Sequence, residues 1–97
     1  MIIIKREDNK ITISGHADYS NANDIVCASV SSIMYTTVNA CLRINNKSID
    51  YKDKGKQVVI ENINKDEITN ELILNMMSLF QDLSSKYPKN IRIESEE

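Results

Sequence analysis

The chain has 97 residues, which predicts a single domain over residues 1–97. It has 12 basic and 14 acidic residues and a formal net charge of −2, and no basic stripe with interleaved aromatic residues is present. The composition therefore does not support direct binding of nucleic acid. No apolar run approaches the roughly 20 residues of a membrane span, and the opening run Met1–Arg6 is short and soon charged for a signal peptide. We expect a cytoplasmic protein without membrane contact, whose thiols stay reduced.

The first 15 residues predict a β-hairpin. Residues 2–6 form a short aliphatic run, and the turn signal Glu7–Asn9 separates them from residues 10–15, where apolar and polar side chains alternate. The polar stretch at residues 17–23 then predicts a loop.

Residues 25–44 predict a long amphipathic helix. Asp24 is of a type that caps helix N-termini well. β-branched residues are frequent in this stretch and lower its intrinsic helix propensity, so we expect tertiary packing to hold the helix. The residues expected on its apolar face are Val26, Val30, Ile33, Thr37, Cys41 and Ile44.

The second half of the chain predicts a second hairpin over residues 48–61, followed by a second helix. Asn64 and Glu67 are spaced as a capping box for that helix. The helix is expected to end just before Pro88, because proline disfavours helical geometry in the residue that precedes it. The apolar face is expected to comprise Ile68, Leu72, Met76, Leu79, Phe80 and Leu83.

Residues 91–93 predict a last strand, and the acidic residues 94–97 predict a solvated tail. The expected order of elements is therefore ββαββαβ. We predict an α+β fold in which two long helices pack on a mixed β-sheet of about five strands.

One stretch, residues 15–31, carries the candidate chemistry, because it holds the single histidine, His16, and one of the two cysteines, Cys27. With Asp24 as the cap, Cys27 lies in the first helical turn, where unpaired backbone N–H groups stabilise a thiolate. The same N–H groups are expected to serve as an oxyanion hole. The alternative is that Cys27 is a small buried hydrophobic residue.

His16 follows a strand, and the loop after it is short enough to bring the strand end close to the helix start. A hydrogen bond between the imidazole and the Cys27 thiol would then activate the nucleophile; the alternative is a solvent-exposed histidine. Asp24 is expected chiefly to cap the helix, and either Asp24 or Asp18 to orient His16. Ser31, one helical turn beyond Cys27, either supports the site or packs.

Cys41 is expected in the core rather than in the site. It lies 14 positions after Cys27, which is roughly 21 Å along one helix, whereas a disulfide needs Cα atoms within about 7 Å. The same separation argues against a zinc site formed by these two cysteines and His16.

The stretch that holds His16 and Cys27 resembles the signature of a known family. Gly15-His16-Ala17, followed by Asp24-Ile25-Val26-Cys27-Ala28 and Val30-Ser31, is similar to the motif of the ribosomal-processing cysteine protease family, Prp. The length of the chain and its expected order of elements also match that family.

The resemblance implies a His/Cys dyad endopeptidase with His16 and Cys27 in the catalytic positions. It implies that the substrate is a large-subunit ribosomal protein made with an N-terminal extension, which the enzyme removes. It further implies a homodimer and the need for neither a metal nor an organic cofactor. We expect Gly15, Asp24 and Ser31 to support the site, and Ala17, Tyr19 and Asn23 to contact the substrate along the loop at residues 17–23.

The chain departs from the family pattern in residues 20–23, where a glycine usually precedes the helix cap and none is present. Asn21 or Asn23 is expected to supply left-handed backbone geometry in its place. Two other functions stay open. A non-enzymatic module that binds a ribosomal protein or an assembly intermediate would leave the thiol unused. A thiol redox sensor would need a nearby resolving cysteine, which the sequence lacks.

Overall fold

The computed structural model describes residues 1–21 and 24–96 of the chain. It contains two β-hairpins, two long helices and a last strand, which confirms the predicted order ββαββαβ. The elements are β1 (Ile2–Glu7), β2 (Lys10–Gly15), α1 (Ile25–Ile44), β3 (Asp50–Asp53), β4 (Gln57–Glu61), α2 (Glu67–Lys86) and β5 (Ile91–Glu96).

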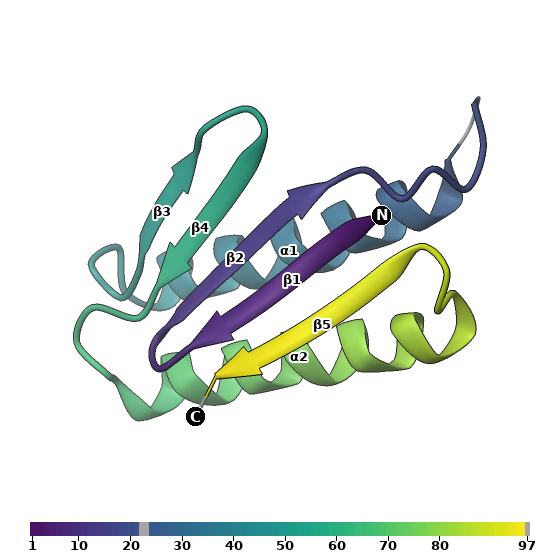
Figure 1. Cartoon of the computed structure of the whole chain (residues 1–97). Coiled ribbons are helices and arrows are strands. Elements are labelled where there is room, and N and C mark those ends of the chain that lie inside the picture. Colours follow the sequence, from purple (N-terminus) through teal and green to yellow (C-terminus); the bar gives the residue numbers. More distant parts are fainter. Residues whose placement is uncertain (22–23, 97) are drawn as a thin grey trace.

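The five strands form one sheet in the order β3-β4-β2-β1-β5. Neighbouring strands are antiparallel except β1 and β5, which are parallel. Both helices cover the same face of this mixed sheet (Figure 1), and α2 leads the chain into β5, because a parallel neighbour cannot be reached through a tight turn. The predicted α+β class is confirmed.

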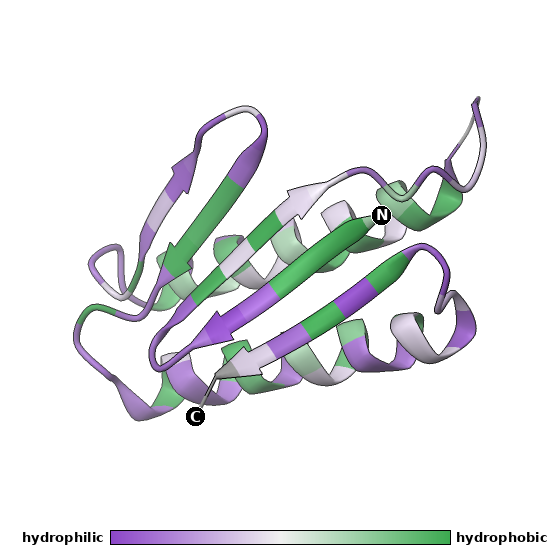
Figure 2. Ribbon diagram, in the orientation of Figure 1, coloured by the Kyte–Doolittle hydropathy of each residue, from purple (hydrophilic) through white to green (hydrophobic). Residues whose placement is uncertain are grey.

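The core lies between the sheet and the two helices. Strand side chains alternate between the two faces of the sheet, and Ile4, Ile11 and Ile60, which face the helices, are at most 1% exposed. Met76 and Phe80 of α2 are fully buried against them. Hydrophobic residues are concentrated in the first half of β1 and along β4, whereas the β1–β2 and β3–β4 turns are largely hydrophilic (Figure 2).

The buried faces of the helices differ from the predicted ones at three positions. Ile44, Ile68 and Leu79 are 58%, 57% and 41% exposed, so their expected place in the core is wrong. Ile68 and Leu79 each come one residue before a buried position of α2, and one residue is a rotation of about 100° around a helix. The α2 residues that are buried are Thr69, Ile73, Met76 and Phe80.

The start of α2 also differs from the prediction. Its cap is Asp66, whose carboxylate accepts hydrogen bonds from the N–H and hydroxyl of Thr69, both at 3.0 Å. The Asn64 side chain instead donates to the carbonyl of Lys47 at 3.2 Å. The expected capping box of Asn64 and Glu67 is therefore wrong, since a better cap lies one position before the helix.

The C-terminal acidic segment is part of the sheet and not the predicted tail. β5 continues to Glu96, and its register with β1 places Glu94 opposite Lys5. Pairing with β1 provides hydrogen bonds for the backbone of this segment.

α1 is long and apolar enough, by length and composition alone, to cross a membrane, with a mean hydropathy of 1.5 over an 18-residue window. The expectation that no stretch approaches a span is wrong on this measure, because Arg43 is the single charged residue of the helix. A helix that supplies a protein core has the same properties, and α1 buries Val26, Val30, Met34, Thr37, Val38 and Cys41.

Asp24 holds both the start of α1 and the loop before it. One carboxylate oxygen accepts from the N–H groups of Val26 and Cys27 at 3.0 Å each, and the other accepts from the Tyr19 N–H at 3.1 Å. The hydrogen bond from the Cys27 N–H, and then those from Tyr19, Ser20 and Val26, hold the pKa of the Asp24 carboxyl below its usual value. The predicted cap is confirmed, and it also fastens the loop after β2 to the helix.

Replacing Asp24 with alanine is expected to lower the melting temperature by about 5 °C, because α1 loses its cap and the loop loses its anchor. The effect depends on pH. A lowered pKa in the folded state means that the carboxylate stabilises the fold above its unfolded-state pKa of about 3.9. That stabilisation disappears as the pH falls through the lower folded-state value. The difference in melting temperature between wild type and Asp24→Ala should therefore begin to shrink as the pH falls below about pH 4, and a difference that does not depend on pH would contradict this role.

Candidate active site

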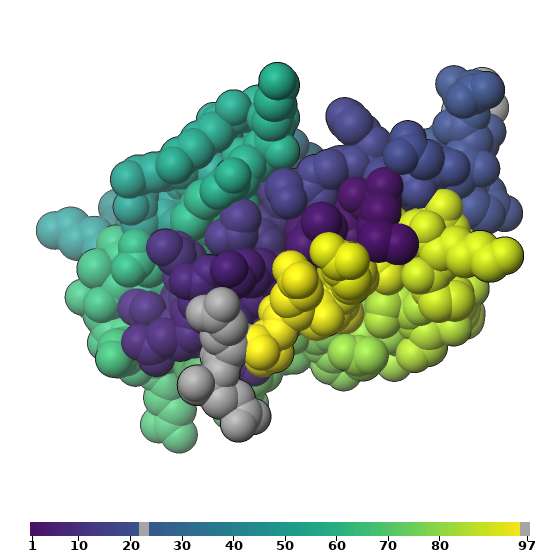
Figure 3. Space-filling view, viewed as in Figure 1, coloured from purple at the N-terminus to yellow at the C-terminus, as the bar shows by residue number. Residues whose placement is uncertain are grey.

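The two residues predicted to carry the chemistry line one cavity. Its volume is about 250 Å³, and His16 and Cys27 both contribute to its wall. The other walls come from the end of β2, the first turns of α1 and the turn between β3 and β4. The tip of that hairpin and the segment after β2 stand on either side of a hollow at one edge of the molecule (Figure 3). The short connection after β2 therefore brings His16 and Cys27 to one site, as predicted.

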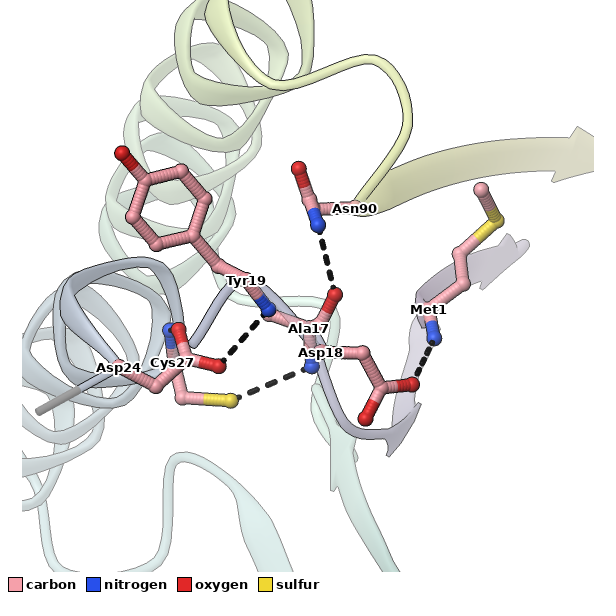
Figure 4. Close-up of polar contacts among 7 residues, drawn as sticks. All are labelled: Met1, Ala17, Asp18, Tyr19, Asp24, Cys27 and Asn90. Atoms are coloured by element: carbon pink, nitrogen blue, oxygen red, sulfur yellow. Dashed lines mark hydrogen bonds and ion pairs between the residues drawn. The ribbon is translucent and has the colours of Figure 1, made fainter. Parts of the chain in front are cut away.

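The expected hydrogen bond between the His16 imidazole and the Cys27 thiol is not present among the described residues. Cys27 Sγ instead accepts a hydrogen bond from the backbone N–H of Ala17 at 3.2 Å. Figure 4 shows the sulfur pointing at that nitrogen. His16 is exposed, so its ring is accessible from the cavity and from solvent.

Three N–H groups in the first turn of α1 already have acceptors within the helix start. Those of Val26 and Cys27 donate to the side chain of Asp24, and that of Ala28 donates to the Asp24 carbonyl at 3.0 Å. The expectation that these groups form an oxyanion hole is therefore wrong for this conformation. Cys27 is half-buried and its thiol is free, and its donor is the N–H of Ala17.

The two candidate carboxylates do not orient His16. Asp24 is occupied by backbone N–H groups of α1 and of the loop. Asp18 pairs with the amino group of Met1 at 3.2 Å (Figure 4). The structural role expected for Asp24 is the one observed, and the additional role of orienting the imidazole is not.

Gly15 and Ser31 both lie at the cavity. Gly15 has φ +86°, and a Cβ at this position would overlap the backbone carbonyl of Met1, so a larger residue would displace the strand end that carries His16. Ser31 is exposed one helical turn after Cys27, with its side chain at the cavity wall.

The residues predicted to contact substrate lie differently from the expectation. The Tyr19 ring packs edge to face against Tyr87, with centroids 5.4 Å apart, and is not part of the cavity wall. Ala17 is 1% exposed, and Asn23 lies outside the described residues. Among the described residues of this loop, the left-handed position is Asp18, with φ +55°, and not Asn21.

The turn between β3 and β4 forms a wall of the cavity that sequence reasoning missed. Asp53, Gly55 and Lys56 contribute to it, together with Tyr35 of α1. The turn is held by a hydrogen bond from the Gly55 N–H to Asp53 Oδ1 at 2.9 Å, and Gly55 has φ +83°. Burial, and then nearby Tyr35 and Asp53, raise the pKa of Tyr51 in the adjoining strand. Residues 53–56 predict a turn, as observed, but no local motif predicts that the turn reaches the site, which it does because β4 pairs with β2.

The second cysteine belongs to the core, as predicted. Cys41 is 1% exposed, and burial raises the pKa of its thiol. Within residues 1–21 and 24–96, no group of three or more His, Cys, Asp or Glu side chains is placed to hold a metal ion.

Comparison with known proteins gives one consistent result. The sequence model of the family described as cysteine protease Prp matches residues 1–92. The ribosomal processing cysteine protease Prp of Staphylococcus aureus strain Mu50 is 31% identical over 98 residues, which cover 94% of this chain and 92% of that protein.

Solved structures resemble the chain over nearly its whole length. The essential ribosomal processing protease Prp from S. aureus, in complex with a covalently linked product peptide, superposes with a TM-score of 0.82 at 25% identity, covering 98% of this chain and 97% of that one. The SMU.848 protein of Streptococcus mutans shares the fold, with a TM-score of 0.77 at 20% identity, covering 97% and 90% of the two chains. With the matching family sequence and the shared fold, the chain belongs to the Prp family of cysteine proteases.

Proposed function

We propose that the chain is an endopeptidase that removes the N-terminal extension of a large-subunit ribosomal protein, with Cys27 as nucleophile and His16 as base. The observation that carries the proposal is that these two residues line one cavity at the start of α1. The relatives support the substrate class, because the S. aureus protein is named a ribosomal processing protease and a structure of it contains a covalently linked product peptide.

The reaction begins when His16 accepts the thiol proton and the Cys27 thiolate attacks the scissile carbonyl. The protonated imidazole then gives its proton to the leaving amine, so that the shortened ribosomal protein departs and a thioester joins Cys27 to the N-terminal extension. Water hydrolyses the thioester with His16 again as the base. A nucleophile and one acid–base group suffice for this sequence, so the proposal needs no metal or cofactor.

His16 must turn toward Cys27 for the first step. Catalytic hydrogen bonds are often long or absent before substrate binds and tighten in the complex. The exposure of His16 supports such a rotation, since no described hydrogen bond holds its ring in another direction. The cytosol keeps thiols reduced, and both cysteines of this chain are free, so we propose that the protein works in the cytoplasm.

The substrate path follows from the walls of the cavity. The sequence predicts that the peptide lies along residues 17–23, but the cavity beside Cys27 extends to the β3–β4 turn, which forms one of its walls. We propose that the peptide lies between that turn and α1, where Tyr35, Asp53 and Lys56 face it. The carboxylate, ammonium and phenol there offer both hydrogen bonds and charge to an extended peptide.

We also propose a homodimer, which the family resemblance implies. The groove between the helices, on the side away from the sheet, supports this association because all its lining side chains are uncharged, so a second copy meets no charge repulsion. Its volume is about 530 Å³, and it is lined by Ile25, Ala28, Ser29, Ser32, Ile33 and Leu83.

Cleavage of the extended ribosomal protein tests the dyad. Cys27→Ala is expected to lower kcat by at least about 1000-fold and His16→Ala by about 100- to 10,000-fold, measured with the source organism's own extended protein. Cys41→Ala serves as the matched control and should retain cleavage. Wild-type rates for Cys27→Ala would overturn the proposed mechanism.

Thiol reactivity distinguishes the enzyme from a module with an unused thiol. Iodoacetamide is expected to modify Cys27 well below the pH at which an ordinary thiol reacts, at about 8.5. Cys41 should lag, because it is 1% exposed and burial raises its pKa. Peptide mass spectrometry measures both rates, and equal slow reaction of the two thiols would favour the non-enzymatic module.

The association state tests the homodimer. Ser32→Arg places a charge in the groove, and like charges brought together across the interface should raise the dissociation constant at least about tenfold. Sedimentation velocity measures the effect, with Thr12→Arg on the opposite face of the sheet as the control. A wild-type protein that stays monomeric at high concentration would contradict the dimer.

A further inference from the structure

The connection between α2 and β5 touches the active-site loop at two places. The rings of Tyr87 and Tyr19 meet edge to face, at an interplanar angle of 82°. Asn90 Nδ2 donates a hydrogen bond to the carbonyl of Ala17 at 2.8 Å, although the two residues are 73 positions apart. Figure 4 shows the Asn90 amide pointing at that carbonyl. The far end of the chain therefore contacts the residue whose N–H donates to Cys27 Sγ.

The geometry points to Asn90 as a positioning residue that holds Ala17 so that its N–H stays directed at Cys27 Sγ. The inference rests on the proposed role of Cys27 as the nucleophile. Two hydrogen bonds in series carry it: Asn90 Nδ2 to Ala17 O at 2.8 Å, and Ala17 N to Cys27 Sγ at 3.2 Å.

Ala17 needs such support because the backbone around it is irregular. Gly15 and Asp18, on either side of His16 and Ala17, both have positive φ, at +86° and +55°. Left-handed geometry is unfavourable for a residue with a Cβ, and this segment follows the end of β2, so no strand ladder fixes its orientation. Side-chain hydrogen bonds do so instead: Asp24 holds the Tyr19 N–H, and Asn90 holds the Ala17 carbonyl.

The backbone of Asn90 is held by two hydrogen bonds. Its backbone N–H donates to the Tyr87 carbonyl at 2.9 Å, at the end of α2, and its carbonyl accepts from the Ile2 N–H at 2.8 Å, at the start of β1. Tyr87 caps the C-terminus of α2, and Ile2 is the first residue of β1. The side-chain amide therefore extends from a backbone that the sheet and α2 hold in place.

The supported hydrogen bond favours the reactive form of the thiol. A donor N–H stabilises a thiolate more than a neutral thiol. The first-turn N–H groups that would otherwise do this are bonded to Asp24. The Ala17 N–H is thus the donor at the sulfur, and losing its orientation should weaken the hydrogen bond that the attacking sulfur accepts. The titratable side chains around the same cavity are His16, Tyr35, Asp53 and Lys56, and an Asn90 substitution changes none of them.

The test compares Asn90→Ala and the similarly sized Asn90→Leu with wild type in the full chain. Both variants are expected to shift the alkylation midpoint of Cys27 upward by about one pH unit, and to lower kcat about tenfold with little change in KM. Asn90→Gln keeps the amide and should recover part of both losses. Asn64→Ala is the matched control, because it removes an amide bonded to a backbone carbonyl at the far end of the sheet, and it should leave both readouts unchanged.

The outcomes separate this inference from the proposed function. A folded Asn90→Ala protein with the wild-type alkylation profile would overturn the positioning role, even if Cys27 is the nucleophile. Cleavage by Cys27→Ala would overturn the proposed function, whatever the alkylation profile. If the Asn90 variants do not fold, hydrogen exchange of side-chain amides in the wild-type protein tests the hydrogen bond between Asn90 and Ala17. The Asn90 side-chain amide should then exchange at least about tenfold more slowly than that of Asn64, and equal exchange would reject the inference.

Discussion

The hydrogen bonds of the Asp24 carboxylate are the constraint on which the site depends. One oxygen accepts from the first turn of α1 and the other from the N–H of Tyr19, so the loop after β2 is folded back against the helix. That fold-back leaves Ala17 N and Cys27 Sγ 3.2 Å apart. It also occupies the helix N–H groups that would otherwise face the thiol. The hydrogen bond that Cys27 Sγ accepts therefore comes from a backbone N–H of the loop and not from one of the helix.

This replacement changes how a cysteine at a helix start can be activated. The partial positive charge of the first turn is offset by the Asp24 carboxylate that caps it. The remaining means of favouring the thiolate are the Ala17 N–H and a protonated imidazole brought in by His16. The Ala17 donor is already in place, and the imidazole is exposed beside the same cavity. In the proposed mechanism, activation by the histidine therefore requires its ring to rotate toward Cys27 when a peptide occupies the cavity.

Sequence reasoning succeeded where the information is local. Alternation, helical spacing, the Asp24 cap and Pro88 predict the elements, and the Gly15-His16-Ala17 motif predicts which residues meet at the site. It failed where a result depends on long-range packing. Asp53 and Lys56 reach the cavity because β4 pairs with β2, and Asn90 reaches Ala17 because β5 pairs with β1. No local sequence pattern encodes either pairing. Likewise, only the three-dimensional arrangement of loop and helix shows that the Asp24 carboxylate, and not the Cys27 thiol, binds the first-turn N–H groups.

The most direct test of the account is the covalent intermediate. A reaction of the chain with the extended ribosomal protein proposed as its substrate, quenched in acid within one turnover, should yield enzyme whose mass has increased by that of the free N-terminal extension minus one water. Fragmentation should place the added mass on Cys27. The same mass on Cys41, or cleavage that proceeds in Cys27→Ala, would contradict the account.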